Sequence, residues 1–254
     1  MGSEASVGSD FSGRVAVVTG GSAGIGAAIS RALADAGAEV WFCARGAERG
    51  RRTALEIGER AHYVPADLTD TARVARFATV VAESATAVDY LVNNAAMDDR
   101  VPFEEATPDA VDRMLDANLR SAILVTRAFL DLLRAGSGRA IVNLVTTNYL
   151  LGLAPFTLYN AAKSGIVGFT RSLARELGPE GIRANMVSPG WVMTEKQLRE
   201  HVTEQDKREL LEAQALKFLL TEEDIVGPVL FLLGSGARAV TGQNLVVDAG
   251  KVMV

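Results

Sequence analysis

Residues 15–26 read Val-Ala-Val-Val-Thr-Gly-Gly-Ser-Ala-Gly-Ile-Gly, and this stretch decides the fold. Its four consecutive apolar residues are typical of a strand that helices cover on both faces. A glycine-rich turn follows and ends where a helical pattern begins, at Ala27. Glycine permits a tight turn and lets the backbone approach a pyrophosphate, which the free N–H groups of a helix N-terminus attract. A glycine cluster alone also occurs in purely structural turns. Its place between a strand and a helix predicts the phosphate loop of a dinucleotide-binding unit.

Beyond this unit, short apolar runs alternate with longer segments of helical period, as in βαβ units that build a parallel sheet. Helix signals occur between the runs: Gly37 and Gly178-Pro179 as stops, Thr107-Pro108 and Thr221 as starts. The charged segment 194–220 breaks the alternation, and we expect it to form a lid or substrate loop. We expect one domain over residues 13–254 after a disordered leader of residues 1–12. The predicted strands are 14–19, 39–44, 62–66, 89–93, 140–145, 183–188 and 244–247.

The composition excludes several classes of protein. A net charge of −5 over 254 residues argues against a nucleic-acid partner, which needs a basic face. No apolar stretch reaches the roughly 20 residues of a membrane span, and the first ten residues lack the features of a signal peptide. A single cysteine, Cys43, allows no internal disulfide. We therefore expect a cytoplasmic protein that binds neither nucleic acid nor membrane.

The end of the second predicted strand bears on the choice of nicotinamide cofactor. Dinucleotide-binding units that prefer NAD usually place an acidic residue there, about 20 residues after the glycine loop, to bind the ribose hydroxyls. This chain has Cys43-Ala44-Arg45-Gly46 and no acid. A guanidinium suits a 2′-phosphate, so Arg45 favours NADP, with NAD as the alternative. The arginines at 49, 51 and 52 are interpreted as a solvated helix face.

Tyr159 and Lys163 are the candidate acid/base pair. The spacing i, i+4 places both on one face of the helix predicted over residues 160–177, with Cβ atoms roughly 6 Å apart. A tyrosine has a pKa near 10 and is a poor base at neutral pH, unless a nearby cation favours the phenolate. The Lys163 ammonium is expected to supply that cation. Tyr-x-x-x-Lys is common by chance, so its meaning depends on the surrounding motifs.

Those motifs resemble the short-chain dehydrogenase/reductase family from about residue 14 to residue 250. They are Thr19-Gly20-x-x-x-Gly24-Ile25-Gly26, Asp67-Leu68, Asn93-Asn94-Ala95-Ala96, Asn118, Tyr159-x-x-x-Lys163 and Pro189-Gly190-x-x-x-Thr194. The resemblance implies an α/β fold: a doubly wound Rossmann-type parallel sheet of seven strands with helices on both faces. It also implies hydride transfer between nicotinamide and a carbonyl or alcohol carbon of a small molecule, without a metal.

The resemblance further implies the roles of individual residues. Asp67 should bind the adenine, and Asn118 should hold a water that relays protons to Lys163. The expected catalytic residues are Asn118, Thr146, Tyr159 and Lys163. The expected cofactor-binding residues are Gly20, Ser22, Ala23, Gly24, Ile25, Gly26, Arg45, Asp67, Leu68, Asn94, Ala95, Ala96, Tyr159, Lys163, Pro189, Gly190, Val192 and Thr194.

The chain departs from the family pattern at two positions. Ala96 stands where the family has glycine, and we expect a slight backbone shift at most. Thr146, thirteen residues before the tyrosine, stands where the family places a serine that polarises the substrate carbonyl. Threonine keeps the hydroxyl donor but stiffens χ1. We expect Thr146 to perform the role of the serine.

The substrate is less clearly indicated. Residues 94–100 and 189–197 resemble those of family members that oxidise sugars at C1. The stretches Tyr149-Leu150-Leu151 and Val101-Pro102-Phe103 would give the substrate cavity an apolar lining, which suits a less polar substrate than a sugar. Asp98 and Asp99 could bind hydroxyl groups or face solvent. The alternatives are a ketoreductase acting on 3-oxoacyl thioesters and a nucleotide-binding regulator or scaffold without turnover. The resemblance implies a homodimer or homotetramer built through segments 122–133 and 166–173.

Overall fold

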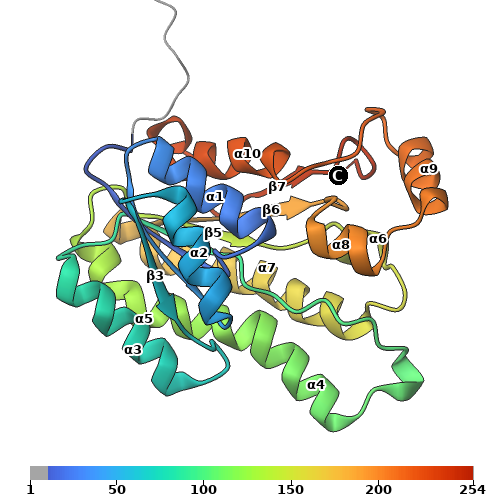
Figure 1. The fold of residues 1–254 in the computed structure, drawn as a ribbon, viewed down its shortest axis with the longest axis horizontal. Helices are drawn as coiled ribbons and strands as arrows, with labels where there is room; N and C mark the ends of the chain where they lie inside the picture. The colour runs from blue at the N-terminus through green and yellow to red at the C-terminus, as the bar shows by residue number, and fades with distance from the viewer. Residues whose placement is uncertain (1–10, 254) are drawn as a thin grey trace, which may run out of the picture.

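The computed structural model describes residues 11–253, which form seven parallel strands between two layers of helices (Figure 1). The strand order is β3-β2-β1-β4-β5-β6-β7, and every neighbouring pair is parallel. All seven predicted strands are confirmed within two residues at each end. They are β1 (Val15–Thr19), β2 (Glu39–Ala44), β3 (Ala61–Pro65), β4 (Tyr90–Asn93), β5 (Ala140–Leu144), β6 (Arg183–Pro189) and β7 (Asn244–Val247).

The helices cover both faces of this sheet (Figure 1). They are α1 (Gly24–Asp35), α2 (Ala47–Ile57), α3 (Thr71–Ser84), α4 (Pro108–Leu115), α5 (Ser121–Ala135), α6 (Asn148–Leu151), α7 (Thr157–Leu177), α8 (Glu195–Glu200), α9 (Glu204–Ala213) and α10 (Glu223–Leu233). Three 3₁₀ turns (Phe103–Glu105, Gly178–Glu180, Ser235–Ala237) and one π-helical turn (Asp116–Arg120) complete the described elements. None of the described helices is both long and apolar enough to span a membrane.

The core has two parts because strand side chains alternate between the faces of the sheet. Ala16 and Val18 of β1 are buried in one apolar cluster with residues of α1 and α10. Val17 faces the opposite cluster, formed with residues of α3 and α5. Each cluster therefore holds one helical layer against the sheet.

Local sequence signals set the ends of several helices. Thr107 caps α4 by accepting a hydrogen bond from the Ala110 N–H group at 3.2 Å, as its position before Pro108 predicts. Gly37 has a φ of +96°, a conformation that glycine adopts without strain and that ends α1.

The segment 194–220, predicted as a lid, contains α8 and α9. Helix α1 begins at Gly24, three residues before the predicted start, so the last two glycines of the loop, Gly24 and Gly26, belong to its first turn.

The start of the described chain corrects one predicted boundary. Residues 1–10 of the expected leader lie outside the described residues. Phe11 is buried, and its ring packs edge-on against Tyr90 with centroids 5.1 Å apart. Phe11 therefore belongs to the folded domain and not to the leader.

The strand order places β1 beside β4 at the centre of the sheet, where the chain crosses from one half to the other. The chain segments that follow β1 and β4 run in opposite directions, and a crevice opens between them at the carboxyl ends of the strands. The glycine loop after β1 and the loop after β4 both lie there.

Candidate active site

The glycine loop forms a cradle that side chains would fill. Gly20 has a φ of +68°, and a Cβ atom on it would lie 3.0 Å from the Cα atom of Ala95. A Cβ atom on Gly26 would lie 2.3 Å from the Gly20 carbonyl oxygen, so α1 could not sit as close to the loop. Ala23, the residue before α1, offers no side-chain cap. The first N–H groups of α1 are therefore available to donate hydrogen bonds to an anion.

A cavity of about 670 Å³ extends from this loop along the carboxyl edge of the sheet. Gly190 and Val192 are the two predicted cofactor residues that do not line it; they line a second cavity next to it. The other predicted cofactor residues all line the first cavity: Gly20, Ser22, Ala23, Gly24, Ile25, Gly26, Arg45, Asp67, Leu68, Asn94, Ala95, Ala96, Tyr159, Lys163, Pro189 and Thr194. A volume and lining of this kind fit a dinucleotide whose pyrophosphate lies at α1.

One end of this cavity brings Arg45 and Asp67 together. Hydrogen bonds from Thr69, at 3.0 Å from its N–H group and 2.8 Å from its hydroxyl, lower the pKa of Asp67. The nearby charge of Arg45 lowers this pKa further. The carboxylate is thus ionised and held in place beside a cation, at the end where the adenosine of a dinucleotide would lie.

The structure also shows cavity residues that the sequence did not indicate. Arg49, interpreted above as part of a solvated face, forms an ion pair of 3.5 Å with Glu195 at the start of α8. Both residues line the first cavity, as does Lys196. Nearly 150 residues separate Arg49 from Glu195, and no spacing rule connects them.

Tyr159 and Lys163 lie on the first turns of α7 and are both buried. The Lys163 Nζ atom lies 5.7 Å from the centroid of the Tyr159 ring. It also donates a hydrogen bond of 2.9 Å to the carbonyl oxygen of Leu144, the last residue of β5. This bond holds the side chain at the floor of the cavity, as the predicted pairing requires.

The electrostatics of this pair differ from the expectation. Burial raises the pKa of Tyr159 above its ordinary value, and the negative charge of Asp98 raises it further. A hydrogen bond with the Thr146 side chain opposes this rise. Burial also lowers the pKa of Lys163 to about 8, although Asp98 favours its charged form. The group that favours the phenolate in this structure is thus Thr146, and Lys163 is tied to Leu144.

Thr146 lies just after β5 and is buried, and its hydroxyl accepts a hydrogen bond of 3.2 Å from the Asn148 N–H group. A hydroxyl that accepts from the backbone can direct its own hydrogen elsewhere. Thr146 and Tyr159 both line the second cavity, so two hydroxyl groups face the same space. Thr147 is also buried and lines this cavity.

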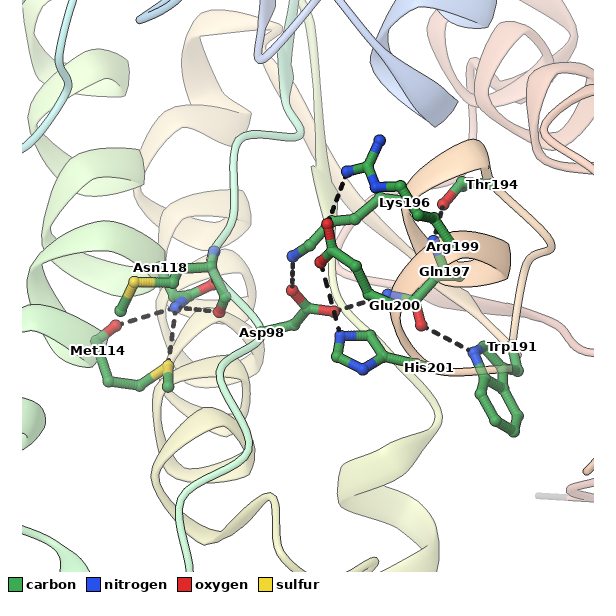
Figure 2. Close-up of polar contacts among 11 residues, drawn as sticks. Asp98, Met114, Asn118, Trp191, Thr194, Lys196, Gln197, Arg199, Glu200 and His201 are labelled. Atoms are coloured by element: carbon green, nitrogen blue, oxygen red, sulfur yellow. Dashed lines mark hydrogen bonds and ion pairs between the residues drawn. The ribbon is translucent and has the colours of Figure 1, made fainter. Parts of the chain in front are cut away.

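Asn118 occupies the π-helical turn Asp116–Arg120 between α4 and α5. Its side-chain amide donates to the Met97 carbonyl oxygen at 2.9 Å, and its side-chain oxygen accepts from the Met97 N–H group at 3.2 Å. A further bond of 3.0 Å reaches the carbonyl oxygen of Met114 (Figure 2). The side chain therefore fixes the loop after β4, and the role of Asn118 in holding a water stays a prediction.

The second cavity, of about 390 Å³, opens beside Tyr159 and corrects one expectation. Residues 149–151 and 101–103, predicted as an apolar lining, are not among the residues that line it. Phe103 is 72% exposed, because the loop after β4 turns it outward. The polar and charged side chains that do line the cavity are Asp98, Arg100, Thr146, Thr147, Asn148, Tyr159, Thr194, Gln197, Asp206 and Lys251.

Asp98 links the loop after β4 to helix α8 above this cavity (Figure 2). Its carboxylate accepts hydrogen bonds from the Lys196 ammonium and, at 2.7 Å, from the Gln197 side-chain amide. Gln197 in turn accepts a bond of 2.9 Å from the Trp191 indole N–H group. Burial raises the pKa of Asp98, but the contacts with Lys196 and Gln197 lower it by more, so the carboxylate is ionised. Asp99 is not among the lining residues of either cavity.

This arrangement suits proton transfer at an oxygen atom beside a bound dinucleotide. A nicotinamide ring supplies a hydride acceptor or donor when bound. Tyr159 and Thr146 present hydroxyl groups to a substrate oxygen. Tyr159 lines both cavities, and Lys163 lines the first. Among residues 11–253, no group of three His, Cys, Asp or Glu side chains could hold a metal ion.

Comparisons with known proteins agree with this geometry. A family model described as "Enoyl-(Acyl carrier protein) reductase" matches residues 20–251. The chain is 38% identical to a Rhizobium meliloti protein named "Probable galactose dehydrogenase", over 95% of this chain and 96% of that one. It is 36% identical to D-xylose 1-dehydrogenase of Caulobacter vibrioides, over 94% and 95% of the two chains. A solved dehydrogenase/reductase structure from Sinorhizobium meliloti matches with a TM-score of 0.88 and 33% identity, covering 95% of this chain and 96% of the other.

The fold and the site define an oxidoreductase that uses a nicotinamide dinucleotide to interconvert an alcohol and a carbonyl group. The match over residues 20–251 and the near-complete coverage of relatives above 30% identity establish the family. The chain belongs to the short-chain dehydrogenase/reductase family.

Proposed function

We propose that this protein is an aldose 1-dehydrogenase that prefers NADP. The observation that carries the proposal is the set of polar side chains in the cavity beside Tyr159, where Asp98, Asn148 and Gln197 bring hydrogen-bonding groups. A sugar needs such partners for its hydroxyl groups, because unpaired polar groups are costly in a closed site. Residues 149–151 and 101–103 do not line this cavity, and its apolar lining comes from Ile25, Val145, Leu153, Phe156, Trp191 and Val192.

The four predicted catalytic residues have distinct parts in this proposal. Tyr159 takes the proton of the C1 hydroxyl group while the hydrogen on C1 leaves as hydride, which converts the cyclic sugar to a lactone. Thr146 donates a hydrogen bond to the same oxygen atom. Lys163 holds the nicotinamide ribose, and Asn118 positions the loop that carries Asp98. The carboxylate of Asp98 has its lone pairs partly committed to Lys196 and Gln197 and offers the remainder to sugar hydroxyl groups.

The relatives support the same class of substrate. Two of them are named for galactose and for D-xylose, which are both aldoses. They share more than a third of their residues with this chain over nearly the full length.

The proposed preference for NADP rests on Arg45, which lines the first cavity at the end of β2 where no acidic residue is present. Arg49, which forms an ion pair with Glu195, also lines this cavity. Their guanidinium groups can pair with a 2′-phosphate.

We propose in addition that the protein is cytoplasmic and forms a homodimer or homotetramer. Helix α5 supports such contacts, because it exposes the apolar Ile123.

A recombinant substrate panel tests the proposed function. Aldoses (galactose, xylose, arabinose, glucose and fucose) are assayed in the oxidative direction with NADP and with NAD. The 3-oxoacyl esters are assayed in the reductive direction with both reduced cofactors. We expect the highest kcat/KM on an aldose with NADP. Turnover of the 3-oxoacyl esters alone would make the protein a ketoreductase. Tight binding of NADPH without turnover of any compound would indicate a regulator or scaffold.

A further inference from the structure

Two cations line the wall of the substrate cavity. Arg100 comes from the loop after β4, and Lys251 comes from the segment that follows β7. The same cavity contains the catalytic Tyr159 and Thr146, and it is also lined by the carboxylates Asp98 and Asp206. A charged side chain that already has a partner within the protein is less available to a substrate. The pairing of these four side chains therefore determines which charge on a substrate the cavity favours.

Both carboxylates are engaged with other partners. Asp98 accepts hydrogen bonds from Lys196 and Gln197. Asp206 closes the capping box of α9 by accepting bonds from Thr203, one of them from the backbone N–H group at 2.8 Å. The charge of Arg100 also lowers the pKa of Asp206, but the two side chains are too far apart for an ion pair. Neither Asp98 nor Asp206 therefore forms an ion pair with Arg100 or Lys251.

The Arg100 guanidinium is held in place without using its N–H groups. Its central carbon lies 5.2 Å from the centroid of the Phe156 ring and 5.7 Å from that of the Trp191 ring. Contacts of this kind use the face of the guanidinium and leave its edge free for a planar acceptor. Within the described part of the chain, no oxygen atom accepts a hydrogen bond from Arg100.

Lys251 is positioned by its backbone. Asp248 accepts hydrogen bonds from the N–H groups of Gly250, Lys251 and Val252 at 2.9, 3.2 and 2.7 Å, and so fixes the turn that carries Lys251. The Lys251 ammonium forms no ion pair with a carboxylate of residues 11–253. The cavity therefore presents a pre-positioned guanidinium and a second positive charge, neither of which forms an ion pair with a carboxylate of residues 11–253.

We propose that the substrate carries a carboxylate group, which Arg100 binds with its free edge and Lys251 attracts, at the end of the molecule remote from the carbon that is oxidised. This inference rests on the proposed function and narrows it: the substrate is a sugar acid with an aldose C1, a hexuronate. A guanidinium matches a carboxylate with two parallel hydrogen bonds. Phe156 connects the two ends of such a site, because its ring centroid lies 6.1 Å from that of Tyr159 and 5.2 Å from the central carbon of the Arg100 guanidinium.

Matched pairs of sugars test the inference. Galacturonate is compared with galactose, and glucuronate with glucose, with NADP as the acceptor. Within each pair only the group at C6 differs, so the ratio of kcat/KM isolates the carboxylate. We expect each uronate to exceed its neutral partner by at least about tenfold at low salt, with the excess falling as the salt concentration rises.

Variants assign the effect to the two cations. Arg100→Met should lower kcat/KM for the uronate by about tenfold to a hundredfold, which is the range for loss of a charge-assisted hydrogen bond. Arg100→Lys keeps the charge but not the planar edge and should recover only part of that loss. Lys251→Met should have a smaller effect of the same kind. In each variant the loss on the uronate should exceed the loss on the neutral sugar, so that the uronate-to-aldose ratio of kcat/KM falls.

Arg208→Met is the matched control, because Arg208 lies on α9 and carries the same charge but does not line the cavity. It should leave the uronate-to-aldose ratio unchanged. Equal kcat/KM on both sugars of each pair, or an equal loss on both in Arg100→Met, overturns the inference and leaves the aldose function standing. Turnover of no aldose in the panel and of neither uronate overturns the proposed function itself.

Discussion

The ammonium nitrogen of Lys163 lies 5.7 Å from the ring centroid of Tyr159 and, at the same time, donates a hydrogen bond of 2.9 Å to the Leu144 carbonyl oxygen. The contact to β5 explains how a long, flexible side chain is held beside the acid/base. It also places a positive charge in a buried position, where the charged form is disfavoured.

The first prediction concerns the stability cost of that buried charge. Burial lowers the pKa of Lys163 from 10.5 to about 8 in the folded protein. Between these values the unfolded chain holds a proton that the folded chain has released, so stability rises with pH, by at most about 1.4 kcal/mol per unit. Below pH 8 Lys163 is charged in both the folded and the unfolded chain, so the full cost of burying its ammonium group lowers the stability. Lys163→Met removes this term, so its melting temperature relative to wild type should be highest below pH 8 and should fall towards pH 10.

Differential scanning fluorimetry of both proteins from about pH 6 to about pH 10 measures this difference. The lost bond to Leu144 shifts the variant by an amount that does not depend on pH. A difference in melting temperature that stays constant across the range would contradict the lowered pKa.

The second prediction concerns Tyr159. Tyr159→Phe removes the hydroxyl group and keeps the ring that packs against Phe156. Turnover should be abolished, while NADPH binding, followed by its fluorescence, should change little. Because burial raises the pKa of Tyr159, oxidation by the wild type should accelerate as the pH rises, since that direction needs the hydroxyl to give up its proton to become a base. Turnover by the phenylalanine variant close to that of wild type would show that another group transfers the proton.

The third prediction concerns the threonine that replaces the usual serine. Thr146→Val keeps the shape of the side chain and removes its hydroxyl, so kcat should fall by about tenfold to a thousandfold, as for the loss of one oxyanion donor. Thr146→Ser is the matched control and should retain activity. Full activity of the valine variant would transfer the role to Thr147, which lines the same cavity.

The fourth prediction concerns cofactor choice. Arg45→Asp replaces a cation near Asp67 with an acid that can bind ribose hydroxyl groups and repel a 2′-phosphate. The ratio of kcat/KM with NADP to kcat/KM with NAD should fall by at least about tenfold. Arg52→Asp provides a control of equal charge change on α2, because Arg52 is exposed and does not line the cavity. An unchanged ratio in Arg45→Asp would assign the 2′-phosphate to Arg49 instead.

The local signals in the sequence were sufficient for the sheet and for the acid/base pair. Val15 to Gly26 predicts a strand, a loop and a helix because each of these depends on neighbouring residues. Tyr159 and Lys163 are four residues apart, so helical geometry alone brings them together. The start of α1 was placed too late because the small residues of a loop can also occupy a helix.

The substrate cavity could not be predicted in the same way. Arg49 and Glu195, or Asp98 and Lys196, are brought together by the fold over about a hundred residues or more. The path of the loop after β4 decided that Arg100 faces the cavity and that Phe103 faces solvent, although they are neighbours in sequence. The stacking of Arg100 between Phe156 and Trp191 fixes that path, and it depends on three separate segments.

The parts of the chain that hold Tyr159 and Lys163 are different from those that close the substrate cavity. Helix α7 carries the reacting pair and packs against the sheet, whereas Gln197, Asp206 and Lys251 come from α8, α9 and the segment after β7. Mutations in these outer segments can therefore change the lining of the substrate cavity while Tyr159 and Lys163 stay in place on α7. A lineage built in this way can acquire new substrates by replacing surface segments, while inheriting its reaction unchanged.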